Sequence, residues 1–191
     1  MDQFHDIRPY NDDEVVEVLE RLINTPDFIN TIISFRFPRW PSFLHAPLVM
    51  AVKWVLRRQV SNISGVYDFQ SRIAGYMARM IKTTTTSVEY RGLDKLQKDK
   101  GYLFISNHRD IAMDPAFVNY GLYLSGFDTV RIAIGDNLLR RPFVSDLMRL
   151  NKSFIVKRSV AGVREMMAAF GQLSNYINHS ITEECCNIWI A

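Results

Sequence analysis

The feature that most constrains the fold is the alternation of short apolar segments with longer amphipathic ones in the second half of the chain. From residue 87 onward the pattern predicts strands at 87–91, 102–106, 129–134, 153–157 and 186–190, with helices at 114–125, 142–150 and 160–178. Strands that alternate with helices pair in parallel, because each helix carries the chain back to the start of the next strand. The sequence therefore predicts an α/β fold, a largely parallel sheet with flanking helices.

The first 86 residues lack this alternation and are expected to be all helical. A capping box of Asn11 and Glu14 begins the first helix, and the four threonines of the tract 83–86 end the last one, since β-branched residues favour extended chain. We therefore expect a helical N-terminal region at 1–86, followed by an α/β domain at 87–191.

Composition limits the classes of function. The 23 basic and 20 acidic residues give a net charge of +3, too weak to indicate nucleic-acid binding but compatible with an anionic lipid surface or a phosphorylated substrate. The two cysteines are adjacent, Cys185 and Cys186, and indicate buried thiols in a reducing compartment rather than a disulfide or a metal site. No signal peptide is recognisable, because the first 30 residues hold acidic runs and no continuous apolar core.

A histidine with carboxylates nearby stands in the turn between a predicted strand and the helix after it. His108 follows the apolar run 102–106, Asp110 and Asp114 come shortly after it, and Pro115 suits the first turn of the helix. Loops held between rigid elements commonly carry catalytic groups, and a carboxylate beside a histidine favours its use as a general base. A surface pair, or a helix N-cap in the case of Asp114, is the alternative.

The run from Leu103 to Pro115 resembles the first motif of the glycerolipid acyltransferases. In that family an apolar strand precedes Ser/Asn-His, four further residues and Asp, often followed by Pro. Here five residues separate His108 from Asp114. The resemblance implies that His108 is the catalytic base. It also implies that a carboxylate orients the imidazole, either Asp114 in a turn with one extra residue or Asp110.

A second stretch, 152–159, carries cations at the end of another predicted strand. Lys157 and Arg158 end that strand, and Ser159 is expected to cap the next helix. A guanidinium beside free helix N–H groups would hold a phosphate, and a basic strand end facing solvent is an equal alternative. The stretch resembles the second acyltransferase motif, whose arginine binds the substrate phosphate. The resemblance implies that role for Arg158, with Lys157 and Arg109 as further substrate-binding candidates.

The third family motif, Glu-Gly-Thr-Arg or a close variant, should follow directly after a strand. Residues 187–191 resemble that strand, and the sequence then stops. We therefore expect the sequence to be a fragment that lacks the third motif and the last part of the phosphate site. The resemblance runs from about residue 89 to residue 191.

The third predicted helix, after Pro47, is the most apolar stretch but is too short and too charged to span a bilayer. It combines Trp54 with Lys53, Arg57 and Arg58, as do helices that lie at a lipid interface. A core helix whose basic end matches the negative pole of its dipole is slightly favoured for this helix alone. An acyl-lipid substrate would favour the interface.

The resemblance implies transfer of a fatty acyl group from an acyl thioester, on coenzyme A or acyl carrier protein, to the hydroxyl of a glycerol phosphate or lysophospholipid. It implies no metal and no cofactor beyond that co-substrate, no nucleic-acid partner, and a cytoplasmic location peripheral to the inner face of the membrane. Two alternatives remain open. One is a metal-dependent hydrolase built on His108, Asp110 and Asp114, and the other is a non-catalytic protein that binds a lipid surface.

Overall fold

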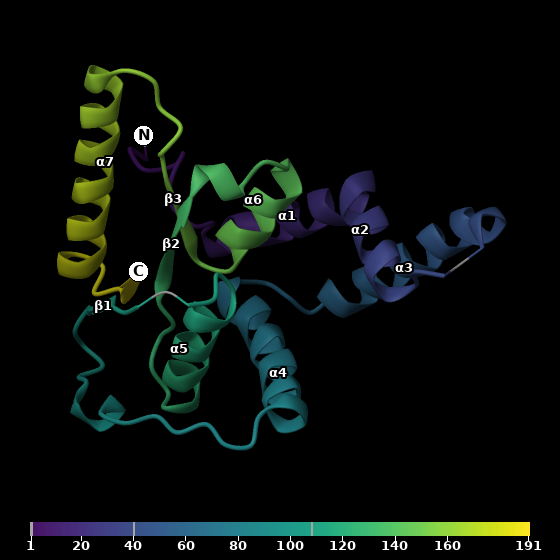
Figure 1. The fold of residues 1–191 in the computed structure, drawn as a ribbon, viewed down its shortest axis with the longest axis horizontal. Helices are drawn as coiled ribbons and strands as arrows, with labels where there is room; N and C mark the ends of the chain where they lie inside the picture. Colours follow the sequence, from purple (N-terminus) through teal and green to yellow (C-terminus); the bar gives the residue numbers. More distant parts are fainter. Residues whose placement is uncertain (1, 40, 108) are drawn as a thin grey trace.

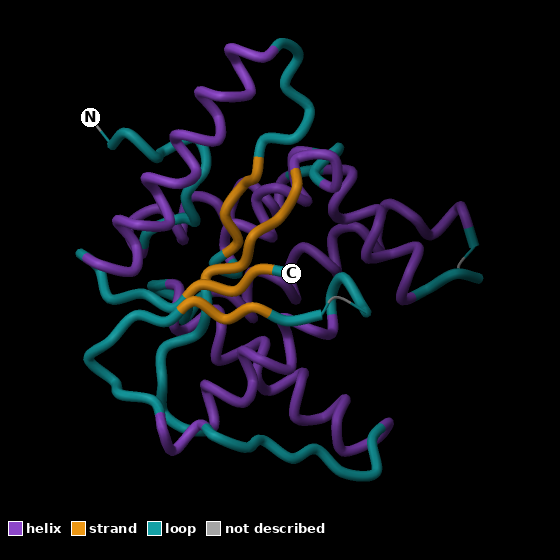
Figure 2. The backbone as a smooth tube through the Cα atoms, turned by 60° about the vertical axis from the view of Figure 1, so that its left-hand side comes forward, coloured by secondary structure: helices purple, strands orange, loops and turns teal. Residues whose placement is uncertain are grey.

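A four-stranded parallel sheet forms the centre of the second half of the molecule, in a computed structural model that describes residues 2–39, 41–107 and 109–191. The strands are β1 (Leu103–Ile105), β2 (Arg131–Gly135), β3 (Ser153–Val156) and β4 (Ile188–Ile190). Their order across the sheet is β1-β4-β2-β3, and every pairing is parallel (Figure 2). The carboxyl ends of the strands therefore share one edge, and the predicted α/β class with flanking helices is confirmed.

Helices cover both faces of the sheet. They are α5 (Met113–Leu124), α6 (Pro142–Leu150) and α7 (Val163–Thr182), with α7 on one side in Figure 1. Successive strand residues point to opposite faces, so Ile188 packs in the cluster that contains Tyr176 of α7. Its neighbour Trp189 packs in the cluster that contains Leu122 of α5. The core of the α/β unit thus has one layer on each side of the sheet.

The strand predicted at 87–91 is wrong. This segment forms no strand, and the ring of Tyr90 packs so closely on α5 that a Cβ on Gly121 would lie 2.5 Å from it. The alternating side chains that suggested a strand serve to cover a helix instead. One edge of the sheet is formed by β1. Leu103 and Ile105 of that strand are exposed, whereas Phe104, which points to the opposite face, packs against the cluster that contains Leu122 of α5.

The N-terminal region is helical as predicted. Its helices are α1 (Asp12–Asn24), α2 (Pro26–Arg36), α3 (His45–Val60) and α4 (Val66–Thr84). The capping box is confirmed, since the Glu14 carboxylate accepts the Asn11 N–H at 2.7 Å. The threonine tract ends α4 later than expected. Thr84 remains helical, with its hydroxyl bonded to the Met80 carbonyl at 2.8 Å.

The N-terminal region packs directly on the α/β unit. Apolar residues of α1 share a buried cluster with Phe143 and Leu150 of α6. At the rim of this contact, Asp146 of α6 accepts hydrogen bonds from Arg21 at 2.9 Å and from Tyr10 at 2.6 Å. The buried cluster that contains the apolar residues of α1 includes residues from both sides of the predicted domain boundary near residue 86. That boundary stays a prediction.

The first ten residues are irregular, but part of them is buried. Phe4 and Ile7 pack in the cluster between β3 and α7, and the Ile155 N–H donates to the Ile7 carbonyl at 2.8 Å. The N-terminal segment, which is folded into turns, is thus held against β3.

Candidate active site

The candidate catalytic groups lie at the carboxyl edge of the sheet, where open α/β folds bind their ligands. The turn after β1 contains the predicted histidine, and the loop after β3 contains the predicted phosphate-binding arginine. The strand order puts β4 and β2 between them. Neighbouring strands are about 4.8 Å apart, so the backbones of β1 and β3 are separated by about 14 Å.

Asp114 is directed back into the turn that follows His108. His108 itself lies outside the described residues. The Oδ2 atom of Asp114 accepts the N–H of Arg109 at 2.6 Å and the N–H of Asp110 at 2.9 Å. The half-buried Asp114 carboxylate thus fixes the two residues that come directly after the histidine.

Asp110 has a different place, at the start of α5. Its Oδ1 atom accepts the N–H groups of Ala112 at 2.9 Å and Met113 at 2.7 Å, which are donors that the first turn of a helix leaves unpaired. Asp110 therefore caps the helix, and the N-cap alternative for Asp114 is wrong because Asp114 already lies inside α5.

The loop after β3 is held by a residue that the sequence did not single out. The carboxylate of Asp136, which follows β2, accepts the N–H of Arg158, the N–H of Ser159 and the Ser159 hydroxyl, each at 3.1 Å. Burial acts to raise the pKa of Asp136, but these donors outweigh it and lower the pKa below its usual value. Asp136 thereby ties the end of β3 to the end of β2.

The prediction that Ser159 caps the next helix is wrong. Helix α7 begins only at Val163, after Gly162 with a φ of 104°, which is a backbone conformation suited to glycine. Ser159 bonds to Asp136 instead, so the phosphate-binding hypothesis for Arg158 depends on its guanidinium and not on an adjacent helix start.

The side chain of Arg158 leans across the end of β2. A Cβ placed on Gly135 would lie 3.3 Å from the Cδ atom of Arg158 and 3.4 Å from its Nε atom. Glycine at the end of β2 thus leaves room for the arginine to pass. The exposed guanidinium is carried one strand closer to the turn that contains His108.

The other two substrate-binding candidates are placed differently. The Lys157 ammonium pairs with the Asp6 carboxylate and donates to Gln172 of α7 at 3.1 Å, so it is engaged on the α7 side of the sheet. Arg109 is exposed in the turn after β1, where its main-chain N–H holds Asp114. Of the two, Arg109 lies on the side of the edge where the histidine is expected.

The structure offers no further metal ligands to the hydrolase alternative. Within 2–39, 41–107 and 109–191, no three His, Cys, Asp or Glu residues are grouped so that they could hold a metal ion. Both cysteines are free thiols, but Cys185 is exposed, which corrects the expectation that both are buried. Cys186 is half-buried, and burial raises the pKa of its thiol.

A family model described as Acyltransferase matches residues 87–190, more than half of the chain. The match includes the turn after β1, the Asp136 turn and the Arg158 loop. The chain belongs to the acyltransferase family. Neither a search of curated proteins nor a search of solved structures finds a match. Membership supports acyl transfer as the activity of this acyltransferase, and its two candidate turns lie on one edge.

The helical region of this acyltransferase has an exposed apolar surface on α2, α3 and their connection. Helix α3 buries only Leu48, whereas Trp54 is 62% exposed with the Arg58 guanidinium 5.7 Å from its ring centroid. Phe35 and Phe43 are more than 80% exposed. Helix α3 is therefore not a core helix, the alternative that was slightly favoured for this helix alone. No helix in the described ranges is long and apolar enough to cross a membrane.

Proposed function

We propose that this acyltransferase moves a fatty acyl group from an acyl thioester, on coenzyme A or acyl carrier protein, to the hydroxyl of a glycerol phosphate or lysophospholipid. One observation carries the proposal. The turn fixed by Asp114 and the guanidinium of Arg158 share the carboxyl edge, and Arg158 leans over Gly135 toward that turn. An acceptor with a hydroxyl at one end and a phosphate at the other can bridge them.

In the proposed reaction, His108 takes the proton from the acceptor hydroxyl as its oxygen attacks the thioester carbonyl. The carboxylate of Asp114 orients the imidazole and stabilises the imidazolium. Collapse of the tetrahedral intermediate forms the ester and releases the thiolate, which takes the proton back from the histidine. Arg158 holds the acceptor phosphate and so positions the hydroxyl. The reaction needs neither a metal nor an acyl-enzyme.

We further propose that the surface of α2 and α3 rests on the cytoplasmic leaflet of a membrane, where long-chain acyl acceptors reside. Exposed Phe35, Phe43 and Trp54 would enter the interface, and nearby arginines such as Arg36 would meet anionic head groups. The same surface would serve a protein that binds lipid without catalysis, which is the second candidate function.

The deciding experiment assays the protein against a panel of lysolipids and glycerol phosphate with both thioester donors. We expect transfer by the wild type and a loss of about 10²–10⁴-fold in His108→Ala. Circular dichroism serves as the check on folding. A His108→Ala variant that keeps most of the wild-type rate would exclude the mechanism. Liposome binding by a wild type that transfers no acyl group would favour the non-catalytic lipid-binding candidate.

A further inference from the structure

The helical region holds a second feature, an apolar groove between α2, α3, α4 and α6, which we call the α6 groove. It consists of two adjoining cavities of about 410 Å³ and about 730 Å³. They adjoin, because five residues line both of them: Phe28, Leu56, Gln59, Tyr76 and Leu147. Volumes in this range are typical of sites for small molecules.

The lining is suited to hydrocarbon with an anionic end. It consists almost wholly of aliphatic and aromatic side chains, above the buried cluster of Ile29, Ile33 and Leu48. The charged residues among those that line the two cavities are Arg36 and Arg72, and none of the lining residues is acidic. The groove is therefore complementary to an acyl chain that carries a carboxylate or phosphate.

The groove has a defined direction relative to the candidate active site. Helix α6 begins shortly after the Asp136 turn, at the carboxyl edge of the sheet, and runs away from that edge toward β3. Phe143, in the first turn of α6, lines the larger cavity, whereas Met148 and Asn151 line the smaller one. From Phe143 to Asn151 the helical rise is about 12 Å. The Met148 end of the groove adjoins a small cavity that is lined by Ala116 of α5, two residues after Asp114, so this end lies on the side of the candidate catalytic turn.

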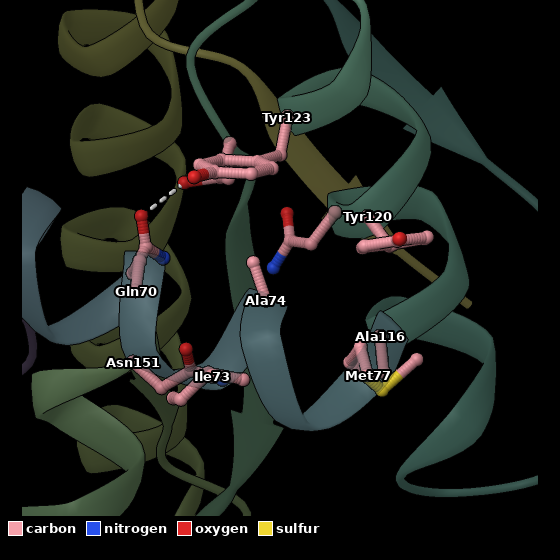
Figure 3. A pocket seen from close by; sticks show the side chains of 10 residues that line it. Gln70, Ile73, Ala74, Met77, Ala116, Tyr120, Tyr123 and Asn151 are labelled. Atoms are coloured by element: carbon pink, nitrogen blue, oxygen red, sulfur yellow. Dashed lines mark hydrogen bonds between the residues drawn. The ribbon is translucent and has the colours of Figure 1, made fainter. Parts of the chain in front are cut away.

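The groove narrows sharply at its Met148 end. Beyond Ile73 and Asn151 lies the cavity between α4 and α5 that is shown in Figure 3. Its volume is about 40 Å³, which is room for a few water molecules. Its wall is fixed by the buried hydrogen bond from the Thr129 hydroxyl to the Gln70 amide oxygen. A chain that lies along α6 must end before this point.

We propose that the α6 groove binds a single long fatty acyl chain, with its carboxyl or thioester end toward Arg72 and Met148 and its tail toward Phe143. The proposal rests on the proposed function, because it assigns a place to the acyl group that is transferred. A helix from a partner protein is a poorer occupant. It is about 10–12 Å wide and would have to bury polar backbone ends, whereas a lipid tail fills a narrow apolar groove completely.

The test measures binding of the fluorescent fatty acid cis-parinarate, with palmitate as competitor, in the absence of any acceptor. Gln59 lines both cavities and its side chain is exposed, so Gln59→Trp fills the groove without disturbing the core. We expect one site per chain in the wild type and binding weakened at least about tenfold in Gln59→Trp, a change of about 1.4 kcal/mol. Gln59→Leu, which adds no bulk, and Val16→Trp, on the exposed face of α1, should bind like the wild type.

The charge at the rim is tested separately. Arg72→Met should weaken binding of palmitate but not of its methyl ester, because only the carboxylate meets the guanidinium. Equal binding of cis-parinarate by Gln59→Trp and the wild type, in folded proteins, would overturn the proposal. So would a wild type that does not bind the fatty acid at all.

Failure of the groove and failure of the proposed function have different outcomes. If Gln59→Trp blocks fatty-acid binding but the wild type transfers no acyl group, the groove proposal stands and the proposed function fails. If the wild type transfers an acyl group but Gln59→Trp leaves fatty-acid binding unchanged, the proposed function stands and the groove proposal fails. If both hold, Gln59→Trp should shift the preference of the enzyme toward shorter acyl donors while Val16→Trp leaves it unchanged.

Discussion

Replacing Asp114 by Asn tests which carboxylate serves the histidine. Because Oδ2 of Asp114 accepts two N–H groups, at 2.6 Å and 2.9 Å, an asparagine can keep the turn only by placing its amide oxygen there. Its NH₂ group then replaces the other carboxylate oxygen and cannot accept an N–H from an imidazole. Asp114→Asn should therefore retain the turn and lose the orientation of His108.

The expected loss in rate and the expected loss in stability differ in size. Losing the orienting carboxylate should reduce the rate by about 10²–10⁴-fold, or roughly 2.7–5.5 kcal/mol. In Asp114→Asn two charge-assisted hydrogen bonds become neutral ones. Because Asp114 is half-buried, this change should lower the free energy of unfolding by about 1–3 kcal/mol. In Asp110→Asn the amide oxygen can still accept from Ala112 and Met113, and asparagine is a good capping residue. That variant should lose less than about tenfold in rate, since charge at a helix start contributes only about 0.3–1 kcal/mol.

The assay compares kcat for acyl transfer at saturating donor and acceptor in the wild type and both variants. Urea unfolding of each protein separates a folding defect from a catalytic one. A larger loss in Asp110→Asn than in Asp114→Asn would refute the reasoning and transfer the orienting role to Asp110. Near-wild-type rates in both would show that neither carboxylate assists the base.

Three further predictions concern charges elsewhere in the fold. Arg158→Ala should raise the KM for phosphorylated acceptors by about 10- to 150-fold, the equivalent of 1.5–3 kcal/mol, and Arg158→Lys should recover part of the loss, both read from acceptor titrations. Asp136→Asn directs an NH₂ group at one of its N–H donors and should raise the same KM by about tenfold with little change in kcat. Burial opposes ionisation of Asp146, yet Arg21 and Tyr10 lower its pKa, so its contribution to stability is present above about pH 4 and is lost as the pH falls below that. Asp146→Asn should accordingly lower the melting temperature at neutral pH, and by progressively less as the pH is lowered below about 4, as calorimetry over a series of pH values would measure.

The sheet could be predicted because the spacing of apolar residues within each segment indicates whether that segment forms a strand or a helix. The parallel pairing follows from that alternation, and with it the placement of both candidate turns on one edge. The order of the strands is not recorded locally, so the position of β4 between β1 and β2 had to come from the structure. The error at 87–91 has the same origin. Tyr90 alternates as in a strand, but its contact with Gly121 decides its conformation.

The motifs locate the two candidate turns in the sequence, and the roles of their residues stay predictions. Asp136 was missed because a Gly-Asp turn has no recognisable role until the end of β3 lies beside it. The helical spacing of Val163, Met167 and Phe170 would indicate a buried face of α7, yet all three are exposed. Length explains this, because a helix of 20 residues extends about 30 Å while the four residues of β3 span about 13 Å. The first half of α7 therefore runs past the strands that would have covered it.

The two inner strands explain how the candidate site is held together. The indole N–H of Trp189 in β4 donates to the Ser106 hydroxyl at 3.1 Å, and the Ser106 N–H donates to the Ile190 carbonyl at 3.3 Å, so β4 anchors the start of the turn that contains His108. Asp136, at the end of β2, anchors the Arg158 loop. Each turn is thus fixed by the strand that lies beside it, across a gap of about 14 Å between β1 and β3. Groups this far apart act almost independently on stability, so under the proposed function a phosphorylated acceptor that contacts both turns would couple them during acyl transfer.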